Sequence, residues 1–199
     1  MGALFGILTA LAIGVSDFFG RTVVVRRGAT VATVVIQAVG IVASMVVLLV
    51  VPGSFIGTDF LLGLASGAGM GLGIWGYLSG LHVSSSAVVG PIVATMSAVI
   101  PFVYTIVRGA DPSGWAVLGA LVAIGGLVLV SAGGGPLGNV TAGVRWSLIS
   151  GVGYGFGLSV IIEATSDSGA WPAVAQRIGA LVLAVGLVVH ARDDLRLVG

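Results

Sequence analysis

The fold is decided by residues 60–107, FLLGLASGAGMGLGIWGYLSGLHVSSSAVVGPIVATMSAVIPFVYTIV, which contain no Asp, Glu, Lys or Arg. A helix needs about 20 apolar residues to cross roughly 30 Å of hydrocarbon, so this run is long enough for two crossings. The run divides at a polar patch made of Ser79, His82, Ser84, Ser85 and Ser86. We therefore predict two membrane-spanning helices joined by a tight turn at this patch.

The rest of the 199-residue chain follows the same pattern. It is 57% hydrophobic and 8% charged, with a mean hydropathy of +1.20, whereas a soluble domain has roughly 25% charged residues. The runs 31–51 and 115–130 are apolar nearly throughout, which favours helices over the alternating strands of a membrane β-barrel. The predicted fold is an all-α, polytopic membrane helix bundle of about seven transmembrane helices, at residues 2–19, 31–51, 60–80, 87–107, 115–132, 144–162 and 173–190.

Several classes of protein are excluded by the residues that the chain lacks. It has no Cys, which excludes disulfides, iron-sulfur clusters and thiol catalysis, and no Lys, which excludes a retinal Schiff base. There is no Walker motif and no His-Glu-x-x-His motif. The net charge of +1 carries no basic cluster for nucleic acid. We predict no enzyme activity, no metal, no cofactor and no nucleic-acid partner.

Arginines in short loops predict the orientation, because positive charge stays on the cytoplasmic side of the membrane. One face of the predicted bundle has only Arg108, and the other has Arg21, Arg26, Arg27, Arg145, Arg192 and Arg196. This count favours an N-terminus outside and a C-terminus inside the cytoplasmic membrane.

An internal repeat is indicated when the first two predicted helices are set beside the last two. Gly14 aligns with Gly155, and the spacing of Gln37 and Gly40 recurs at Gln176 and Gly179. The unit of such a repeat is five helices, so the second copy would enter the membrane from the opposite side, as in many secondary transporters. Residues 1–133 would form one complete repeat, and residues 144–199 the first two helices of an inverted second repeat.

Two stretches resemble the EamA-type transporters of the drug/metabolite transporter superfamily. Residues 84–131, from SSSAVVGPIV to GGLVLVS, resemble the end of an EamA repeat, with Pro101 in the middle of a helix. Residues 10–27, ALAIGVSDFFGRTVVVRR, resemble the first helix of family members with an acidic residue near its end. The family usually has Gly-Glu where this chain reads Gly109-Ala110-Asp111. It also generally has ten helices and an inside N-terminus.

The resemblance implies a transporter that moves small organic metabolites or drugs by alternating access, driven by a proton gradient or by exchange. An alternative from another class is a membrane assembly subunit whose glycine-rich helix faces dock on a second protein. A further alternative is an inactive fragment of a longer transporter. Besides the lipid bilayer and a small-molecule substrate, the partners left open are a second copy in a homodimer and three further C-terminal helices.

Polar groups at membrane depth are the candidate substrate-binding residues, because unpaired polar groups are costly there. The amides of Gln37 and Gln176 suit a central site or ordinary interhelical hydrogen bonds. Arg177 could pair with Glu163 or with an anionic substrate, or extend to the membrane interface. Asp17 is a candidate proton or substrate site, with pairing to Arg21 as the alternative.

Trp75 and Tyr154 are the best candidates for lining a pocket, with core packing as the alternative. Glycines recurring every four residues in the third predicted helix leave one face without side chains, so a neighbouring helix can approach to backbone distance. These glycines are Gly63, Gly67 and Gly71, and Gly151, Gly153, Gly155 and Gly157 could act similarly in the sixth. Pro101 should kink the fourth helix and free a carbonyl toward a cavity.

Overall fold

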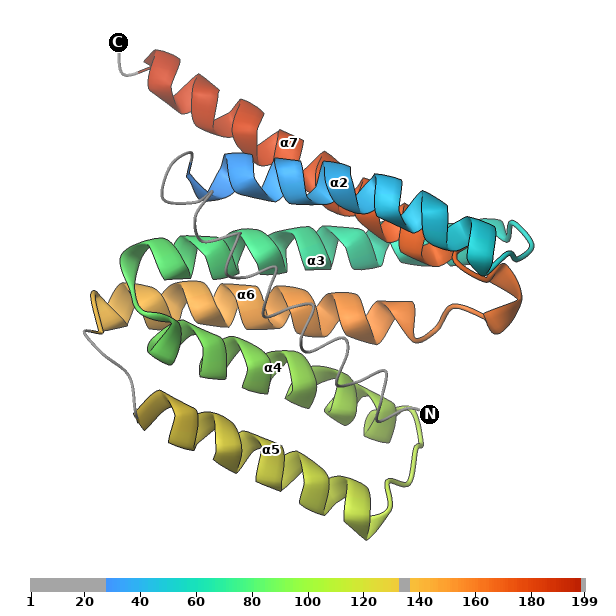
Figure 1. Cartoon of the computed structure of the whole chain (residues 1–199), viewed down its shortest axis with the longest axis horizontal. Helices are drawn as coiled ribbons and strands as arrows, with labels where there is room; N and C mark the ends of the chain where they lie inside the picture. The colour runs from blue at the N-terminus through green and yellow to red at the C-terminus, as the bar shows by residue number, and fades with distance from the viewer. Residues whose placement is uncertain (1–27, 133–136, 198–199) are drawn as a thin grey trace.

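The computed structural model describes residues 28–132 and 137–197, and these residues form six α-helices and one short 3-10 helix, η1 (Figure 1). The bounds of the helices agree with the predicted bounds to within four residues, except that the last helix continues beyond residue 190. The predicted helix at 2–19, with Asp17, lies outside the described residues. The elements are α2 (Ala29–Val50), α3 (Gly57–Val83), α4 (Ser86–Val107), α5 (Gly114–Ala132), α6 (Val140–Ile161), η1 (Ser166–Ser168) and α7 (Trp171–Leu197).

Four of the described helices are long and apolar enough to cross a membrane: α2, α3, α4 and residues 171–190 of α7. Helix α5 is apolar over Gly114–Gly126, and α6 is less apolar because glycine and serine make up much of it. Large apolar side chains cover the outer surface, and Leu49 and Trp115 are each 83% exposed. The structure is therefore an all-helical bundle with the composition of a membrane-embedded protein.

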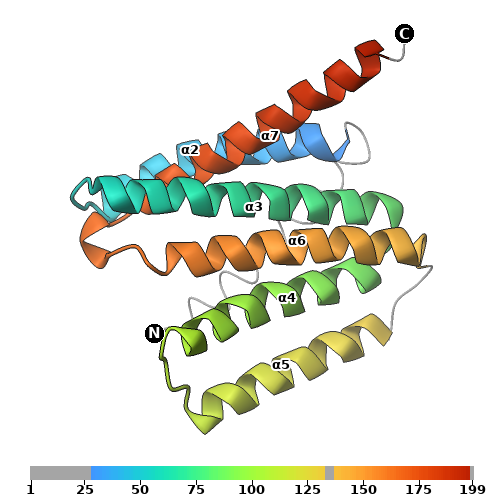
Figure 2. The ribbon, with the colours of Figure 1, turned by 180° about the vertical axis from the view of Figure 1, so that it is seen from behind.

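The helices lie side by side in a row, with α2 and α7 crossing at one edge, then α3, α6, α4 and finally α5 (Figure 1 and, from behind, Figure 2). Connections 51–56, 108–113 and 162–170 lie at one end, here called the Trp171 end. The turns around Ser84 and Asn139 lie at the other, the Ser84 end. Helix α3 runs parallel to α7 and antiparallel to α6, and it packs most extensively against these two helices.

The predicted glycine face of α3 lies against α7. A methyl group added to Gly63 would lie 2.5 Å from the Pro172 carbonyl oxygen, and one on Gly67 only 2.1 Å from that of Gln176. At Gly71 the nearest atoms are the Ala180 backbone, at 3.0 Å. The two backbones touch along this line, and the prediction of close approach is confirmed.

A second glycine face on α3 lies against α6. A methyl group on Gly69 would lie 2.8 Å from the Gly153 carbonyl oxygen, and one on Gly76 would lie 3.0 Å from the Ser150 amide nitrogen. Helix α6 also has two such faces, since Gly153 and Gly157 meet α3, whereas Gly151 and Gly155 meet side chains of α4. Helices α3 and α6 therefore each pack closely on two sides.

The turn between α3 and α4 is as tight as predicted, because only Ser84 and Ser85 separate the two helices. The predicted turn was too long at its start, since Ser79 and His82 belong to α3, which continues to Val83. The Ser84 hydroxyl donates to the Leu137 carbonyl at 2.7 Å, tying this turn to the segment before α6.

Helix α4 continues through both of its prolines, Pro91 and Pro101. Because proline has no N–H, Pro101 cannot bond to the Ser97 carbonyl four residues earlier. An open, apolar hollow of about 480 Å³ lies between α4 and α6, and Pro91 rather than Pro101 lines it. The kink at Pro101 stays a prediction.

Candidate functional site

Gln37, Ser66, Gln176 and Arg177 form a group of polar side chains in the interior of the bundle, called the polar layer below. Gln37 is 1% exposed and Ser66 is fully buried, and both belong to apolar helices. Gln176 and Arg177 are half-buried near the start of α7. Three of these four residues were predicted from the sequence, and Ser66 was missed.

Ser66 connects three helices. The Gln176 Nε2 donates to the Ser66 hydroxyl at 2.7 Å, and this hydroxyl donates to the Gly157 carbonyl at 2.6 Å. The chain of bonds runs from α7 through α3 to α6, at the place where glycines bring the three backbones together. A serine between two closely packed glycines of α3 was the signal in the sequence that could have found it.

Arg177 extends from α7 to α2. Its Nη1 donates to the Gln37 Oε1 at 3.3 Å. Its aliphatic part lies over Gly40, where an added methyl group would be 3.0 Å from Arg177 Cδ. Gly40 therefore makes room for the arginine one helical turn from the glutamine.

Gln37 and Ser66 lie far from the ends of their helices, whereas Gln176 and Arg177 start about 8 and 9 Å along α7 and extend to Ser66 and Gln37. At 1.5 Å per residue, Gln37 is about 12 Å from the start of α2 and about 20 Å from its end. By the same measure Ser66 is about 14 Å from the start of α3 and about 25 Å from its end. In helices that span a membrane, this depth is close to the middle of the hydrocarbon.

No family model, curated protein or solved structure matches the chain. The contacts of the described residues therefore carry the functional argument.

Trp75 lies on α3 and the Tyr154 ring contacts α3, both about two turns or more beyond Ser66, toward the Ser84 end. The Trp75 indole N–H donates to the Thr30 hydroxyl at 3.2 Å, and its ring packs edge-on against Trp146 at a centroid distance of 5.0 Å. The Tyr154 ring covers Gly73, where an added methyl group would be 2.7 Å from Tyr154 Cγ. Both aromatic residues pack between helices, and the structure does not bring them to the glutamines.

Asp59, in the first turn of α3, is a buried carboxylate that sequence reasoning missed. It is 3% exposed. One of its oxygens accepts hydrogen bonds from the Thr165 amide at 3.0 Å, from the Thr165 hydroxyl at 2.6 Å and from the Ser168 hydroxyl. Asp59 thus fastens the connection between α6 and α7 onto the start of α3.

Further bonds join the two connections that meet at this end. The Ser54 amide donates to the Asp167 carbonyl at 2.8 Å, and the Ala170 amide donates to the Val51 carbonyl at 3.2 Å. Trp171 Nε1 donates to the Gly53 carbonyl at 3.2 Å. The Trp171 end of α2, α3 and α7 is therefore closed by two interlocked connections.

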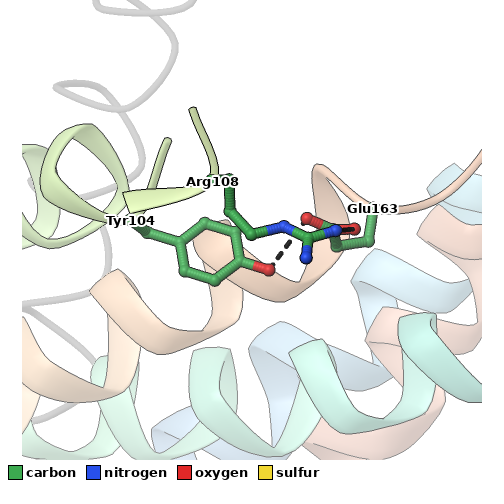
Figure 3. Close-up of polar contacts among 3 residues, drawn as sticks. All are labelled: Tyr104, Arg108 and Glu163. Carbon is green, nitrogen blue, oxygen red and sulfur yellow. Dashed lines mark hydrogen bonds and ion pairs between the residues drawn. The ribbon is translucent and has the colours of Figure 1, made fainter. Parts of the chain in front are cut away.

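Glu163 pairs with Arg108, and the alternative pairing with Arg177 is wrong. Arg108 Nη2 lies 2.9 Å from one oxygen of Glu163, and the Tyr104 hydroxyl donates to the other at 2.8 Å (Figure 3). Arg177 contacts Gln37 at the polar layer, whereas Glu163 lies beyond the end of α6. Both arginines were compatible with the sequence, and the parallel packing of α4 on α6 decides between them, because it brings the ends of these two helices together.

These contacts lower the pKa of Glu163 below the ordinary value of 4.5, through the Tyr104 hydroxyl first and Arg108 second, against partial desolvation. A lowered carboxyl pKa contributes stability that is complete above the ordinary pKa and is lost as the pH falls through the lowered one.

We expect acidification from pH 6 to pH 3 to lower the thermal midpoint of the detergent-solubilised protein more than that of the Glu163→Gln variant. Circular dichroism melts of the two proteins over this range measure the difference. Asp111→Asn, at an exposed acid in connection 108–113, is the matched control and should behave like the wild type. Equal acid sensitivity of the wild type and Glu163→Gln would contradict the expectation.

Arg108 and Arg145 lie at opposite ends of the bundle, as the predicted loops require. Arg108 comes directly after α4, and Arg145 lies in the first two turns of α6.

Within residues 28–132 and 137–197, no three His, Asp or Glu side chains come together in a way that could hold a metal ion.

Proposed function

We propose that the protein is a multi-pass membrane transporter of the EamA-like kind, moving small organic metabolites or drugs by alternating access. The observation that carries the proposal is the polar layer. Polar side chains near mid-membrane usually face the bundle interior and mark substrate pathways, and they rarely face lipid. The transporter would lie in the cytoplasmic membrane, with α5, α6 and residues 2–19 also spanning it.

The predicted repeat is consistent with this proposal through the positions of Gln37 and Gln176. In the inverted-repeat plan they are equivalent residues of the second and seventh helices, and substrate sites lie at the interface between the repeats. Gln37 reaches Arg177 beside Gln176, so the two equivalent segments meet at the polar layer. The arginine count favours the Ser84 end as the cytoplasmic end, whereas the EamA resemblance favours the opposite orientation.

The packing of the glycines favours a transporter over an assembly subunit. The faces offered as docking surfaces for a second protein are occupied within the chain, because Gly63, Gly67 and Gly71 meet α7 and Gly153 and Gly157 meet α3. Among the described helices, α5 has the most glycines that face open space: Gly114, Gly119, Gly125 and Gly126. A homodimer would dock there.

The test is uptake by proteoliposomes containing the purified full chain. Vesicles are incubated with a defined mixture of amino acids, organic acids, sugars and aromatic amines, and their contents are measured by mass spectrometry against protein-free vesicles. We expect at least one solute to accumulate, and Gln37→Ala to lower its initial rate about tenfold or more, because a buried hydrogen-bonding group is lost. Asp17→Asn should lower proton-driven uptake.

Val39→Ala is the matched control, since Val39 lies on α2 two residues from Gln37 and is 64% exposed. It should keep the wild-type rate to within about twofold, as surface changes usually do. No accumulation above protein-free vesicles by a folded, monodisperse protein would refute transport. Unaltered uptake in Gln37→Ala and Asp17→Asn would remove these two residues from the site.

A further inference from the structure

Arg177 carries a charge that no acidic side chain of the described residues neutralises. The salt bridge found within residues 28–132 and 137–197 joins Arg108 and Glu163 at the Trp171 end. The described bond of Arg177 is to the neutral Gln37 amide, at 3.3 Å, which is long for a charged donor. A guanidinium has five N–H donors, so most of its hydrogen-bonding capacity is unused by these residues.

The direction of the side chain argues against a role at the membrane surface. An arginine that extends to the interface places its guanidinium near a helix end. Arg177 starts about 9 Å along α7, but its Cδ lies over Gly40 and its Nη1 reaches Gln37, the middle of α2. The charge therefore points into the bundle, away from the nearer end of its own helix.

We propose that Arg177 is the anchor of a binding site for an organic monocarboxylate, with Gln37 holding the guanidinium in place. This inference rests on the proposed transport function and names its substrate class. A planar guanidinium matches a carboxylate with two parallel N–H···O bonds. One arginine without a second cation beside it in the described residues fits a single negative charge, and a phosphate or sulfate dianion would be left half-neutralised.

The site can be tested by binding, independently of transport. The purified full chain in detergent is titrated with sodium benzoate, with benzamide as an uncharged molecule of the same shape, and with sodium sulfate, all at constant ionic strength. The readout is the thermal midpoint, which rises when a ligand binds the folded state. We expect benzoate to raise the midpoint, and benzamide and sulfate to have little effect.

Variants assign the effect to the residue. Arg177→Gln should raise the benzoate concentration for the half-maximal effect about tenfold or more, the loss expected for a charge-assisted hydrogen bond. Arg177→Lys keeps the charge but not the planar guanidinium. Its half-maximal benzoate concentration should lie between those of the wild type and Arg177→Gln. Arg145→Gln removes an exposed arginine from the start of α6 and should bind benzoate like the wild type.

The outcomes separate this inference from the proposed function. Benzoate binding that depends on Arg177, without uptake of any solute, supports the site and refutes transport. Uptake of neutral solutes that Arg177→Gln leaves unchanged keeps transport and overturns the site. The site is equally overturned if benzamide or sulfate matches benzoate on the wild type, a comparison that holds even where Arg177→Gln fails to fold.

Discussion

Replacing Gly67 by alanine should unfold or separate the bundle more than any other single methyl group added to α3. The new Cβ would lie 2.1 Å from the carbonyl oxygen of Gln176 and 2.9 Å from the amide nitrogen of Ala180, both of them backbone atoms. Ordinary contact begins near 3.4 Å, so α3 and α7 would have to move apart by more than 1 Å along a tightly packed line. We expect the free energy of unfolding to fall by about 3 kcal/mol or more, at the upper end for overpacked sites.

The matched control is Gly126→Ala in α5. Gly126 is also a helical glycine, but an added methyl group there meets nothing within 4 Å. Since alanine favours a helix over glycine by up to about 1 kcal/mol, this variant should be as stable as the wild type or slightly more so. Thermal melts and gel filtration in detergent measure both variants. If Gly67→Ala melts like Gly126→Ala, the α3–α7 contact described above is wrong.

Replacing Asp59 by alanine should lower the thermal midpoint by about 5 °C or more, because three donors that converge on one carboxylate oxygen would lose their acceptor. Loss of the carboxylate should destabilise connection 162–170 before it destabilises the whole bundle. Hydrogen exchange of the amides in connection 162–170, read by mass spectrometry, should speed up most strongly at Thr165 and its neighbours.

Asp59→Asn keeps the shape of the side chain and one acceptor oxygen. Its thermal midpoint should lie between those of the wild type and Asp59→Ala. Asp111→Ala is the control, since it removes an exposed carboxylate at the same end of the bundle. Unchanged exchange in connection 162–170 of Asp59→Ala would show that the carboxylate does not hold that connection.

The helices could be predicted because each contains a long apolar run with few charges, and their ends could be predicted because glycine, proline and polar residues interrupt these runs. Gly63, Gly67 and Gly71 predicted close packing by their spacing alone. The partner helix could not be read from that spacing. Only the structure shows that these glycines meet α7, and that Gly69 and Gly76 meet α6.

The contacts of the candidate site could be predicted only in part. Gln37, Gln176 and Arg177 were found because polar groups are conspicuous in apolar runs. Their partners lie on other helices, and Gln37 meets Arg177 across 140 residues. Asp59 was missed for a similar reason, since Thr165 and Ser168 are ordinary loop residues until α3 and α7 lie parallel. The EamA resemblance, the repeat and the role of Asp17 stay predictions.

The glycines and serines of α6 have a consequence for how the chain enters a membrane. Ser150 donates to the Gly73 carbonyl at 2.6 Å, and Ser147 and Ser159 donate to carbonyls within α6 itself. Glycine and serine contribute little to the free energy of partitioning into lipid, and α6 is not among the described helices that are apolar enough to span on their own. As a spanning helix of the proposed transporter, α6 would therefore integrate late and cooperatively, leaving the translocon only when α3 and α4 are already in the bilayer to receive it.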